Sequence, residues 1–343
     1  MDEPIVVLGA GGFIGRALRR RLAGTREVRC FDQRWSEDDL EASSERHHTC
    51  DIATDDGIRA VLDASRDASG LVHLAAYYDF KNRPDPRYER IESGLQRLLE
   101  RLKADAPPDM PFVYASSMAN VKPTEPGRRL TEESPRWRPW AYPAHKMRCE
   151  ELLEAATMPQ PRCELVLAGV YSDWCELVPL YFQLERARQP SLHSNLYPGP
   201  TDRGLTYVHV DDVASAFEKA LTILHGCSGL HRYLIGEDEP MTYAAIHGSA
   251  RTAFGHEDAQ LRRVPRLMAK AGAAVFRATG AERFVRPWMI DYAGEHFELD
   301  VSRAHRDLDW KAEHAISEQL AGICHRAREH PDKWRQLNEA RPR

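Results

Sequence analysis

The sequence predicts an α/β fold, with a doubly wound parallel sheet and a smaller C-terminal lobe. Short apolar runs alternate with helical patterns up to about Tyr171, glycines follow the first run, and the texture changes after about Ser172. Strands that alternate with helices are typical of parallel sheets, because each crossover between parallel strands needs a connecting segment. The expected division is a sheet domain over 1–171 with 205–235 returning to it, a lobe over 172–204 and 236–330, and a tail over 331–343.

The first strand, Ile5–Leu8, is a short apolar run, and the pattern becomes helical over Phe13–Leu22. Between them the turn carries Gly9 and Gly12, and Gly15 follows in the first helical turn. Glycines let the backbone approach a ligand closely, and the free N–H groups at a helix start favour a pyrophosphate. The segment therefore predicts a dinucleotide site, against the alternative of a purely structural glycine turn.

The next two strands supply further candidate contacts. Val28–Phe31 ends in Asp32, at about the distance along the chain where a carboxylate binds ribose hydroxyls. Asp51 and Ile52 follow a strand that ends near Cys50, and they are plausible neighbours of an adenine ring. The run Leu71–Ala76 ends in small residues that leave room for a cofactor, and we interpret its His73 as a satisfied histidine within the sheet.

The remaining elements follow in alternation. In chain order the expected elements are a helix at Arg87–Lys103, a strand at Pro111–Ser116, a helix at Tyr142–Ala156, a strand at Leu165–Tyr171, a helix at Leu177–Arg188, a strand at Thr206–Val210, a helix at Val213–Leu224 and a strand at Tyr233–Ile235. Short helices and loops are expected after that, up to about His330.

Composition excludes several classes of function. The net charge is −5 and arginines are interspersed with acids, so no nucleic-acid partner is expected. No apolar run is long enough to span a membrane. The nearest, Val264–Gly280, is interrupted by Arg266, Lys270 and Arg277, and we interpret it as an amphipathic helix, with membrane contact as a second interpretation. The chain enters its first strand directly, so no signal peptide is expected.

The cysteines and histidines indicate the cellular compartment and whether a metal site is expected. The seven cysteines are scattered without a C-x-x-C pair, which predicts a reducing, cytoplasmic location. The fifteen histidines show no spacing typical of a ligand set, so we predict no metal.

A candidate catalytic set lies in the middle of the chain. Tyr142 and Lys146 are four residues apart at the start of a helix and therefore share one face. A tyrosine with a pKa near ~10 is a poor base, but an adjacent lysine cation favours the phenolate. Ser117, at the end of a strand, can hydrogen-bond the same substrate oxygen. The alternative is a surface pair on a helix.

At this point the chain resembles the extended short-chain dehydrogenase/reductases, specifically the NAD-dependent epimerase/dehydratase group. The matching motifs are GAGGFIG at Gly9–Gly15, Asp32, Asp51 with Ile52, LVHLAA at Leu71–Ala76, YASS at Tyr114–Ser117, YPAHK at Tyr142–Lys146, GVY at Gly169–Tyr171, TYVHVDDVASA at Thr206–Ala216, and FELDVSRAHRDLDW at Phe297–Trp310.

The resemblance implies a Rossmann domain, a C-terminal substrate lobe and bound NAD(P). It implies that Ser117, Tyr142 and Lys146 are catalytic, that Lys146 also holds the nicotinamide ribose, and that two copies pair through the tyrosine helix and the preceding one. The implied cofactor contacts are Gly9, Gly12, Phe13, Ile14, Gly15, Asp32, Asp51, Ile52, Leu74, Ala75, Ala76, Tyr142 and Lys146. Asp32 favours NAD over NADP because it repels a 2′-phosphate, and Arg34 is the counter-argument.

Departures from the family pattern concern the substrate. Met118 and Ala119 replace the Asp-Glu pair of 4,6-dehydratases, so dehydration is not expected. Gly169 replaces an asparagine, Ile91 replaces another, and Leu205 replaces an arginine that clamps a diphosphate in nucleotide-sugar enzymes. Arg203 or Arg286 is the alternative clamp. Apolar and aromatic residues lie nearby in the sequence and are the expected substrate surroundings, namely Tyr171, Trp174, Leu177, Leu196 and Tyr197.

The expected function is hydride transfer between nicotinamide and a secondary alcohol or ketone of a sugar-like or other small hydroxylated substrate. The alternatives are a nucleotide-sugar epimerase and, in another class, a non-catalytic dinucleotide sensor.

Overall fold

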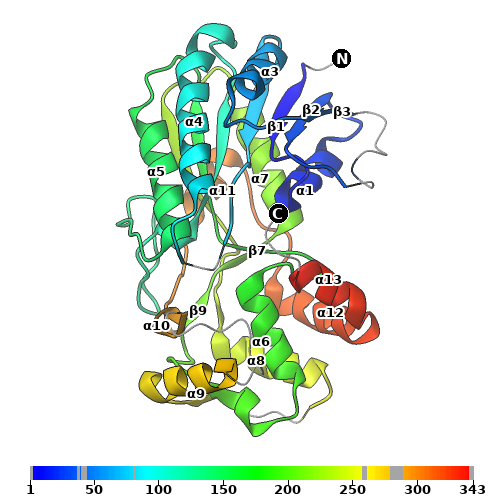
Figure 1. Cartoon of the computed structure of the whole chain (residues 1–343), viewed down its shortest axis with the longest axis vertical. Coiled ribbons are helices and arrows are strands. Elements are labelled where there is room, and N and C mark those ends of the chain that lie inside the picture. The colour runs from blue at the N-terminus through cyan, green and yellow to red at the C-terminus, as the bar shows by residue number, and fades with distance from the viewer. Residues whose placement is uncertain are drawn as a thin grey trace.

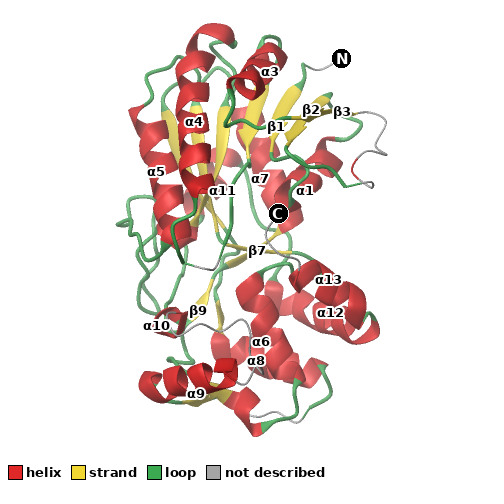
Figure 2. Cartoon of the chain, viewed as in Figure 1, coloured by secondary structure: helices red, strands yellow, loops and turns green. Residues whose placement is uncertain are grey.

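The centre of the molecule is a seven-stranded parallel sheet (Figure 2). The computed structural model describes residues 3–36, 39, 45–79, 82–256, 261–278 and 289–339. The strands lie in the order β11-β6-β5-β4-β1-β2-β3, so the chain runs outward from β1 in both directions. Their bounds are β1 Ile5–Leu8, β2 Val28–Asp32, β3 Glu45–Thr49, β4 Gly70–His73, β5 Phe112–Ser117, β6 Arg162–Leu167 and β11 Leu230–Ile235. This confirms the predicted doubly wound α/β fold.

Helices cover both faces of the sheet, as expected for strands whose runs are apolar on both sides. One face packs against α1 Phe13–Leu22, α7 Val210–Ile223 and α11 Ser302–Leu308, and the other against α3 Asp55–Ser65, α4 Pro86–Asp105 and α5 Ala141–Ala155. Local signals set the helix starts. Thr54 accepts a hydrogen bond from Gly57 N (3.1 Å) at the start of α3, and Asp85 caps α4, where Pro86 opens the helix.

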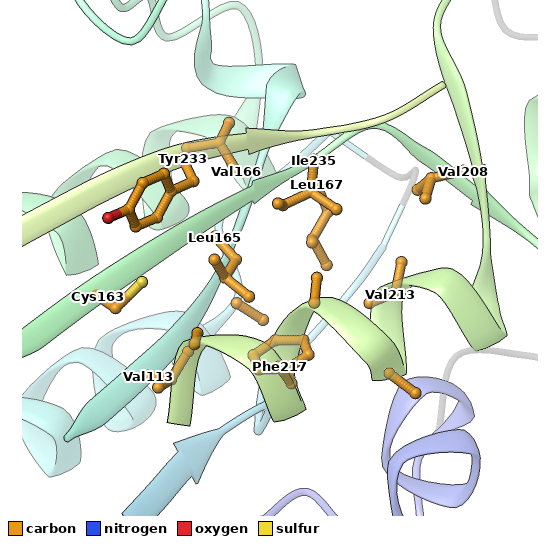
Figure 3. Packing of buried hydrophobic residues seen from close by; sticks show 14 of the residues in the cluster. Val113, Cys163, Leu165, Val166, Leu167, Val208, Val213, Phe217, Tyr233 and Ile235 are labelled. Atoms are coloured by element: carbon orange, nitrogen blue, oxygen red, sulfur yellow. The ribbon is translucent and has the colours of Figure 1, made fainter. Parts of the chain in front are cut away.

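The core on the α7 side includes a segment from far along the chain. Figure 3 shows Leu165 and Leu167 of β6 facing Val213 and Phe217 of α7. The 297–310 segment contributes to the same cluster, and Trp310 Nε1 donates to Asp212 O at 3.0 Å. The expected lobe boundaries therefore need correction, because residues 297–310 pack with the sheet domain. We propose that the lobe resumes only after them.

The lobe is built from segments that are widely separated in the sequence. Its core joins α6 Val178–Arg188, α8 Tyr243–Ala253 and α12 Ile316–Glu329 (Figure 1). The expected tail is partly wrong as well: α13 Pro331–Glu339 packs into this core through buried Trp334, whose Nε1 donates to Glu185 Oε1 at 2.9 Å. The smaller elements are η1 Met118–Asn120, η2 Leu192–Asn195, β8 Leu196–Tyr197, β9 Gly204–Leu205, β12 Met241–Thr242, β13 Arg262–Arg263, α9 Arg266–Ala278 and α10 Met289–Tyr292.

Two predicted elements differ at the junction with the lobe. The strand expected over Leu165–Tyr171 is two strands, because the chain leaves the sheet at Ala168, and β7 Gly169–Tyr171 pairs instead with β10 Tyr207–His209. The helix α7 starts three residues earlier than predicted. His209 Nδ1 accepts from Asp211 N at 3.3 Å and caps that start.

Within the described ranges, no helix is both long enough and apolar enough to cross a bilayer.

Candidate cofactor and active site

A cavity of about 360 Å³ opens at the carboxyl ends of β1, β2 and β4. This is the edge of a parallel sheet at which such folds bind ligands. Of the predicted cofactor contacts, those that line the cavity are Gly9, Gly12, Asp32, Asp51, Ile52, Leu74, Ala75 and Ala76. Phe13, Ile14, Gly15, Tyr142 and Lys146 are not among its lining residues.

The glycine turn brings backbone against backbone. Gly9 has φ +80°, and a Cβ built on it would lie 2.7 Å from Ala75 N. Gly15 lies in the first turn of α1, where a Cβ would collide with Gly9 O. Helix α1 begins after Gly12 with neither a side-chain cap nor an acidic residue in its first turn. The turn thus offers N–H groups and the positive end of a helix dipole, which suits a dinucleotide pyrophosphate.

Asp32 fixes the end of β2 to the glycine turn. Its Oδ2 accepts from Gly11 N at 2.9 Å and its Oδ1 accepts from Arg34 N at 3.1 Å. Burial raises the pKa of Asp32, with these backbone hydrogen bonds acting in the opposite direction. Each oxygen keeps acceptor capacity, so the residues fit ribose hydroxyls at this side of the cavity. Gly11, the central glycine of the motif, was missed by the spacing argument.

The opposite rim carries residues that the sequence analysis did not assign to the site. Arg90 Nη2 donates to Asp51 Oδ2 at 2.5 Å, and Arg87 Nη2 donates to Tyr77 OH at 2.7 Å. Both arginines come from the start of α4 and line the cavity. Ile91, at the position where the resemblance leads one to expect an asparagine, lines it too. Only the position of α4 across the sheet brings these side chains here, so local sequence carried no signal for them.

The predicted catalytic side chains lie on neighbouring elements. Ser117 ends β5, and Tyr142 and Lys146 occupy the first turns of α5. A hydrogen bond joins the Ser117 and Tyr142 side chains. Lys146 Nζ donates to Ala115 O at 2.8 Å and to Tyr114 OH at 3.3 Å, and lies 5.9 Å from the Tyr142 ring centroid. The three residues can therefore act on one substrate oxygen.

Burial is the largest cause of the pKa shifts of Tyr142 and Lys146. It raises the pKa of Tyr142 to about 12, although the hydrogen bond with Ser117 acts in the opposite direction. It lowers the pKa of Lys146 to about 8. The pKa of Tyr142 therefore lies above its ordinary value, because desolvation of the phenolate outweighs the hydrogen bond with Ser117. That Lys146 lowers this pKa stays a prediction.

Aromatic rings surround Tyr142. Tyr78 packs edge-on against Tyr142 at 4.7 Å between centroids, and Trp140 lies at 5.7 Å. Further out, Tyr292 OH, from the lobe, donates to Pro139 O at 2.8 Å. The sequence analysis missed Tyr78 and Trp140, although Trp140 is only two residues from Tyr142.

Among the described residues, the positions expected to bind a diphosphate hold no cation without a partner. Leu205 pairs with Met241 in a two-stranded sheet, and Gly169 opens β7. Arg203, the alternative clamp, forms an ion pair with Glu125 and donates to Gly294 O at 3.0 Å. The other alternative, Arg286, lies outside the described residues.

The apolar residues expected near the substrate are mostly lobe packing. Tyr171 is buried in the lobe core, and Tyr197 is buried with its OH donating to Ala293 O at 2.6 Å. Trp174 lies under Lys333, and Leu196 is exposed. Leu177 is partly buried and packs against the lobe core as well. Its Cδ2 lies 3.1 Å from where a Cβ on residue 169 would be.

His73 is buried in β4 as expected, but it is not satisfied. Neither ring nitrogen has a hydrogen-bond partner within the described part of the chain. Burial lowers the pKa of His73 to about 3, so the ring is neutral. Among the described residues, no group of three or more His, Cys, Asp or Glu side chains could hold a metal ion.

Comparison with known proteins decides the family. A model of the NAD-dependent epimerase/dehydratase family matches residues 5–236. The chain belongs to this family. The protein is thus an NAD-dependent enzyme of the epimerase/dehydratase type, and the alternative of a non-catalytic sensor is set aside. The residues present fit NAD, since a Cβ on Gly9 would collide with Ala75 and the carboxylate of Asp32 lines the cavity.

Several solved structures share the fold over almost the entire chain. They include dTDP-glucose 4,6-dehydratase from Bacillus anthracis in complex with NAD, at 17% identity and TM-score 0.72, covering 97% of this chain and 99% of that one. UDP-glucose 4-epimerase from Thermotoga maritima with UDP-glucose matches at 17% identity and TM-score 0.69, covering 96% and 100%. A short-chain dehydrogenase/reductase from Agrobacterium tumefaciens with bound NAD matches at 18% identity and TM-score 0.69, covering 96% and 98%.

No curated protein matches the sequence.

Proposed function

We propose that this family member moves hydride between the nicotinamide of NAD and a secondary alcohol or ketone carbon of a sugar-like or other small hydroxylated substrate. The observation that supports the proposal is the Ser117–Tyr142–Lys146 set, in which Ser117 ends β5 while Tyr142 and Lys146 lie in the first turns of α5. NAD, when bound, supplies the hydride acceptor or donor. The cavity residues around Gly9 and Asp32 hold its adenosine and pyrophosphate parts.

The side chains then have distinct roles at the substrate oxygen. Tyr142 gives a proton to this oxygen or takes one from it. Ser117 shares a hydrogen bond with Tyr142 and polarises the same oxygen. Lys146, held by Ala115 O, places a cation beside the phenol and binds the nicotinamide ribose. Oxidoreduction and epimerisation both use these steps, and they differ in whether the ketone is released or returned with its other face presented.

The test is removal of the Tyr142 hydroxyl. Tyr142→Phe should lower turnover roughly 10²–10⁴-fold, since a positioned acid/base group contributes that much, while the NAD dissociation constant stays near the wild-type value. Lys146→Met should damage both turnover and NAD affinity, and Ser117→Ala should do less harm than either. Activity is followed by NADH absorbance together with the stereochemistry of candidate sugars.

Tyr88→Phe is the matched control. The Tyr88 hydroxyl is buried without a hydrogen-bond partner in the described part of the chain, so its removal breaks no bond. Near wild-type turnover in Tyr142→Phe would sink the proposed chemistry.

A nucleotide-sugar epimerase is the second candidate, favoured by fold neighbours that are described with UDP-glucose or as acting on dTDP-glucose. We propose instead that affinity does not depend on a nucleotide diphosphate. A diphosphate taken from water needs charge-assisted partners, whereas Leu205 is apolar and Arg203 is already paired with Glu125. With Met118 and Ala119 after Ser117, we also expect no 4,6-dehydration.

Calorimetric titration with UDP and with GDP, in the presence of NAD, separates the two candidates. Weak or absent heat is the expected result. Micromolar binding of either nucleotide would make the nucleotide-sugar epimerase the leading assignment.

The oligomeric state and the cellular location of the protein are further parts of the proposal. We propose a homodimer through α4 and α5, and analytical ultracentrifugation tests it. No large apolar side chain in the described part of these helices is exposed, so such an interface would be largely polar. The seven cysteines are free, which supports the proposed reducing cytoplasm.

A further inference from the structure

Exposed apolar side chains gather at one end of the lobe. Only four large hydrophobic residues of the described chain are exposed: Leu196 (37%), Ile223 (38%), Leu267 (81%) and Met268 (65%). Leu267 and Met268 stand in the first turn of α9, and Leu196 lies in β8, which pairs with β13 just before α9. Figure 1 shows α9 at the end of the lobe that faces away from the sheet.

Arginines frame this apolar group. Arg262 and Arg263 form β13, with Arg262 beside Leu196 in the register, and Arg266 opens α9. All three are exposed, and none forms an ion pair with a residue in the described ranges. We define the lobe tip as Leu196, Arg262, Arg263, Arg266, Leu267 and Met268.

Basic residues predominate in the described segment that carries β13 and α9. The segment 262–278 contains five basic residues and no acid, in a chain whose net charge is −5. Among the described residues, the nearby carboxylates belong to α10 and the turn after it, whereas Glu257 and Asp258, five and four residues before Arg262, lie outside the described residues. Asp291 is paired with Lys270 at 2.7 Å, and Glu295 interacts with Arg266 and Arg203. The described segment 262–278 therefore carries a positive charge in a chain whose net charge is negative.

We propose that the lobe tip docks on the surface of a bilayer that contains anionic lipids. Unpaired arginines alone would suit any polyanion, and exposed Leu and Met side chains alone would suit any apolar partner. The combination of an apolar centre and a cationic rim matches the acyl-chain boundary and the phosphate layer of a membrane surface. The contact is peripheral, since no described helix can cross the bilayer.

The geometry keeps the cofactor side away from the lipid. The cavity lies at the strand ends of the sheet domain, and the lobe tip lies at the opposite end of the lobe (Figure 1). Docking therefore leaves NAD entry open, and vesicle binding can be measured independently of catalysis.

Cosedimentation with vesicles tests the proposal. The full chain is mixed with phosphatidylcholine vesicles that contain phosphatidylglycerol, and with vesicles of phosphatidylcholine alone. Binding should need the anionic lipid and should weaken as salt is added. Each arginine near an anionic surface contributes roughly fivefold to partitioning. The variant Arg262→Gln/Arg263→Gln/Arg266→Gln should therefore bind roughly 10²-fold more weakly.

The control changes the same charge elsewhere. Arg59→Gln/Arg306→Gln/Arg335→Gln removes three exposed arginines from α3, α11 and α13 and should bind like the wild type. Leu267→Ser/Met268→Ser should weaken binding roughly tenfold, because it removes apolar contact with the acyl boundary. Circular dichroism and NAD affinity establish that each variant is folded.

Equal binding to both kinds of vesicle, or equal losses in the lobe-tip and control variants, would overturn the proposal. So would a homodimer that the Leu267→Ser/Met268→Ser variant abolishes while the wild-type chain ignores anionic vesicles, because the face would then serve a second copy.

Discussion

The cofactor side and the lobe are specified by the sequence in different ways. Around the cavity, the critical contacts are made by backbone: a Cβ on Gly9 would lie 2.7 Å from Ala75 N, and Asp32 holds Gly11 N at 2.9 Å. In the lobe, contacts join side chains that are far apart in the chain, such as Trp334 with Glu185. A ligand held by close backbone approach leaves glycines at fixed spacing in the sequence. A pocket made by side chains from separate segments leaves no such record.

The largest expected effect tests where the boundary between the two regions lies. Trp310 is fully buried among sheet-domain residues although it follows lobe segments. Trp310→Ala should lower the free energy of unfolding in urea by about 3–5 kcal/mol, and NAD affinity should fall with it. Trp310→Phe, which keeps most of the ring but leaves Asp212 O without its donor, should cost about 1–3 kcal/mol.

Trp334→Ala is the lobe counterpart. Trp334 is equally buried in the lobe core, so the variant should destabilise the protein while leaving NAD affinity unchanged. If both alanine variants change NAD affinity equally, the two regions do not behave as separate packing units.

The second prediction concerns the junction itself. Glu237 follows β11 where the chain enters the lobe, and its Oε2 accepts from Ile316 N at 3.0 Å. Burial raises the pKa of Glu237 from 4.5 to about 7, and the charge of neighbouring Asp212 acts in the same direction. Because the pKa of this carboxyl is higher in the folded than in the unfolded state, the free energy of unfolding falls as pH rises between about 4.5 and about 7.

Glu237→Gln should therefore gain up to about 3 kcal/mol of unfolding free energy above pH 7 and little near pH 4.5. Urea unfolding at several pH values measures this difference. Glu239→Gln, at an exposed position two residues later, should change stability little at any of these pH values. An unchanged pH dependence in Glu237→Gln would mean that the buried carboxyl does not carry the effect.

The smallest effect sharpens the backbone argument. Gly9 and Gly127 both have φ near +80°, but a Cβ on Gly127 would meet nothing within 4 Å. Gly127→Ala should cost roughly 1–2 kcal/mol from its left-handed backbone alone. Gly9→Ala should cost roughly 1–3 kcal/mol more, because β4 must move away, and should also weaken NAD binding. Equal costs in thermal unfolding would contradict the close-approach explanation.

Sequence patterns were sufficient for the first elements and for most of the cavity. The bounds of β1 and α1 match the apolar run and the helical period residue for residue, since both signals are local. The family motifs placed Asp51 and Ala75 at strand ends, and these residues do line the cavity. Parallel strands deliver their carboxyl ends to one edge, so the order of elements was enough to bring them together.

Long-range placement was not recoverable from these patterns. Arg90 lines the cavity only because the fold brings the start of α4 next to the loop after β3, which contains Asp51. The strand expected through Tyr171 breaks at Ala168 because β10 offers a second partner. The pKa of Tyr142 depends on how deeply the fold buries the phenol, and no spacing in the sequence measures that depth.

Because residues 297–310 complete the core of the sheet domain, that core can form only after they have been translated. The last strand of the sheet ends at Ile235, and Phe297 follows about sixty residues later. At roughly 5–20 residues per second of translation, the face formed by β6, β11 and α7 waits several seconds for its cover. During that interval the residues that complete this core are either in the ribosomal exit tunnel or not yet translated, among them Leu299, Leu308 and Trp310. The nascent sheet domain meanwhile exposes apolar surface that a chaperone can bind.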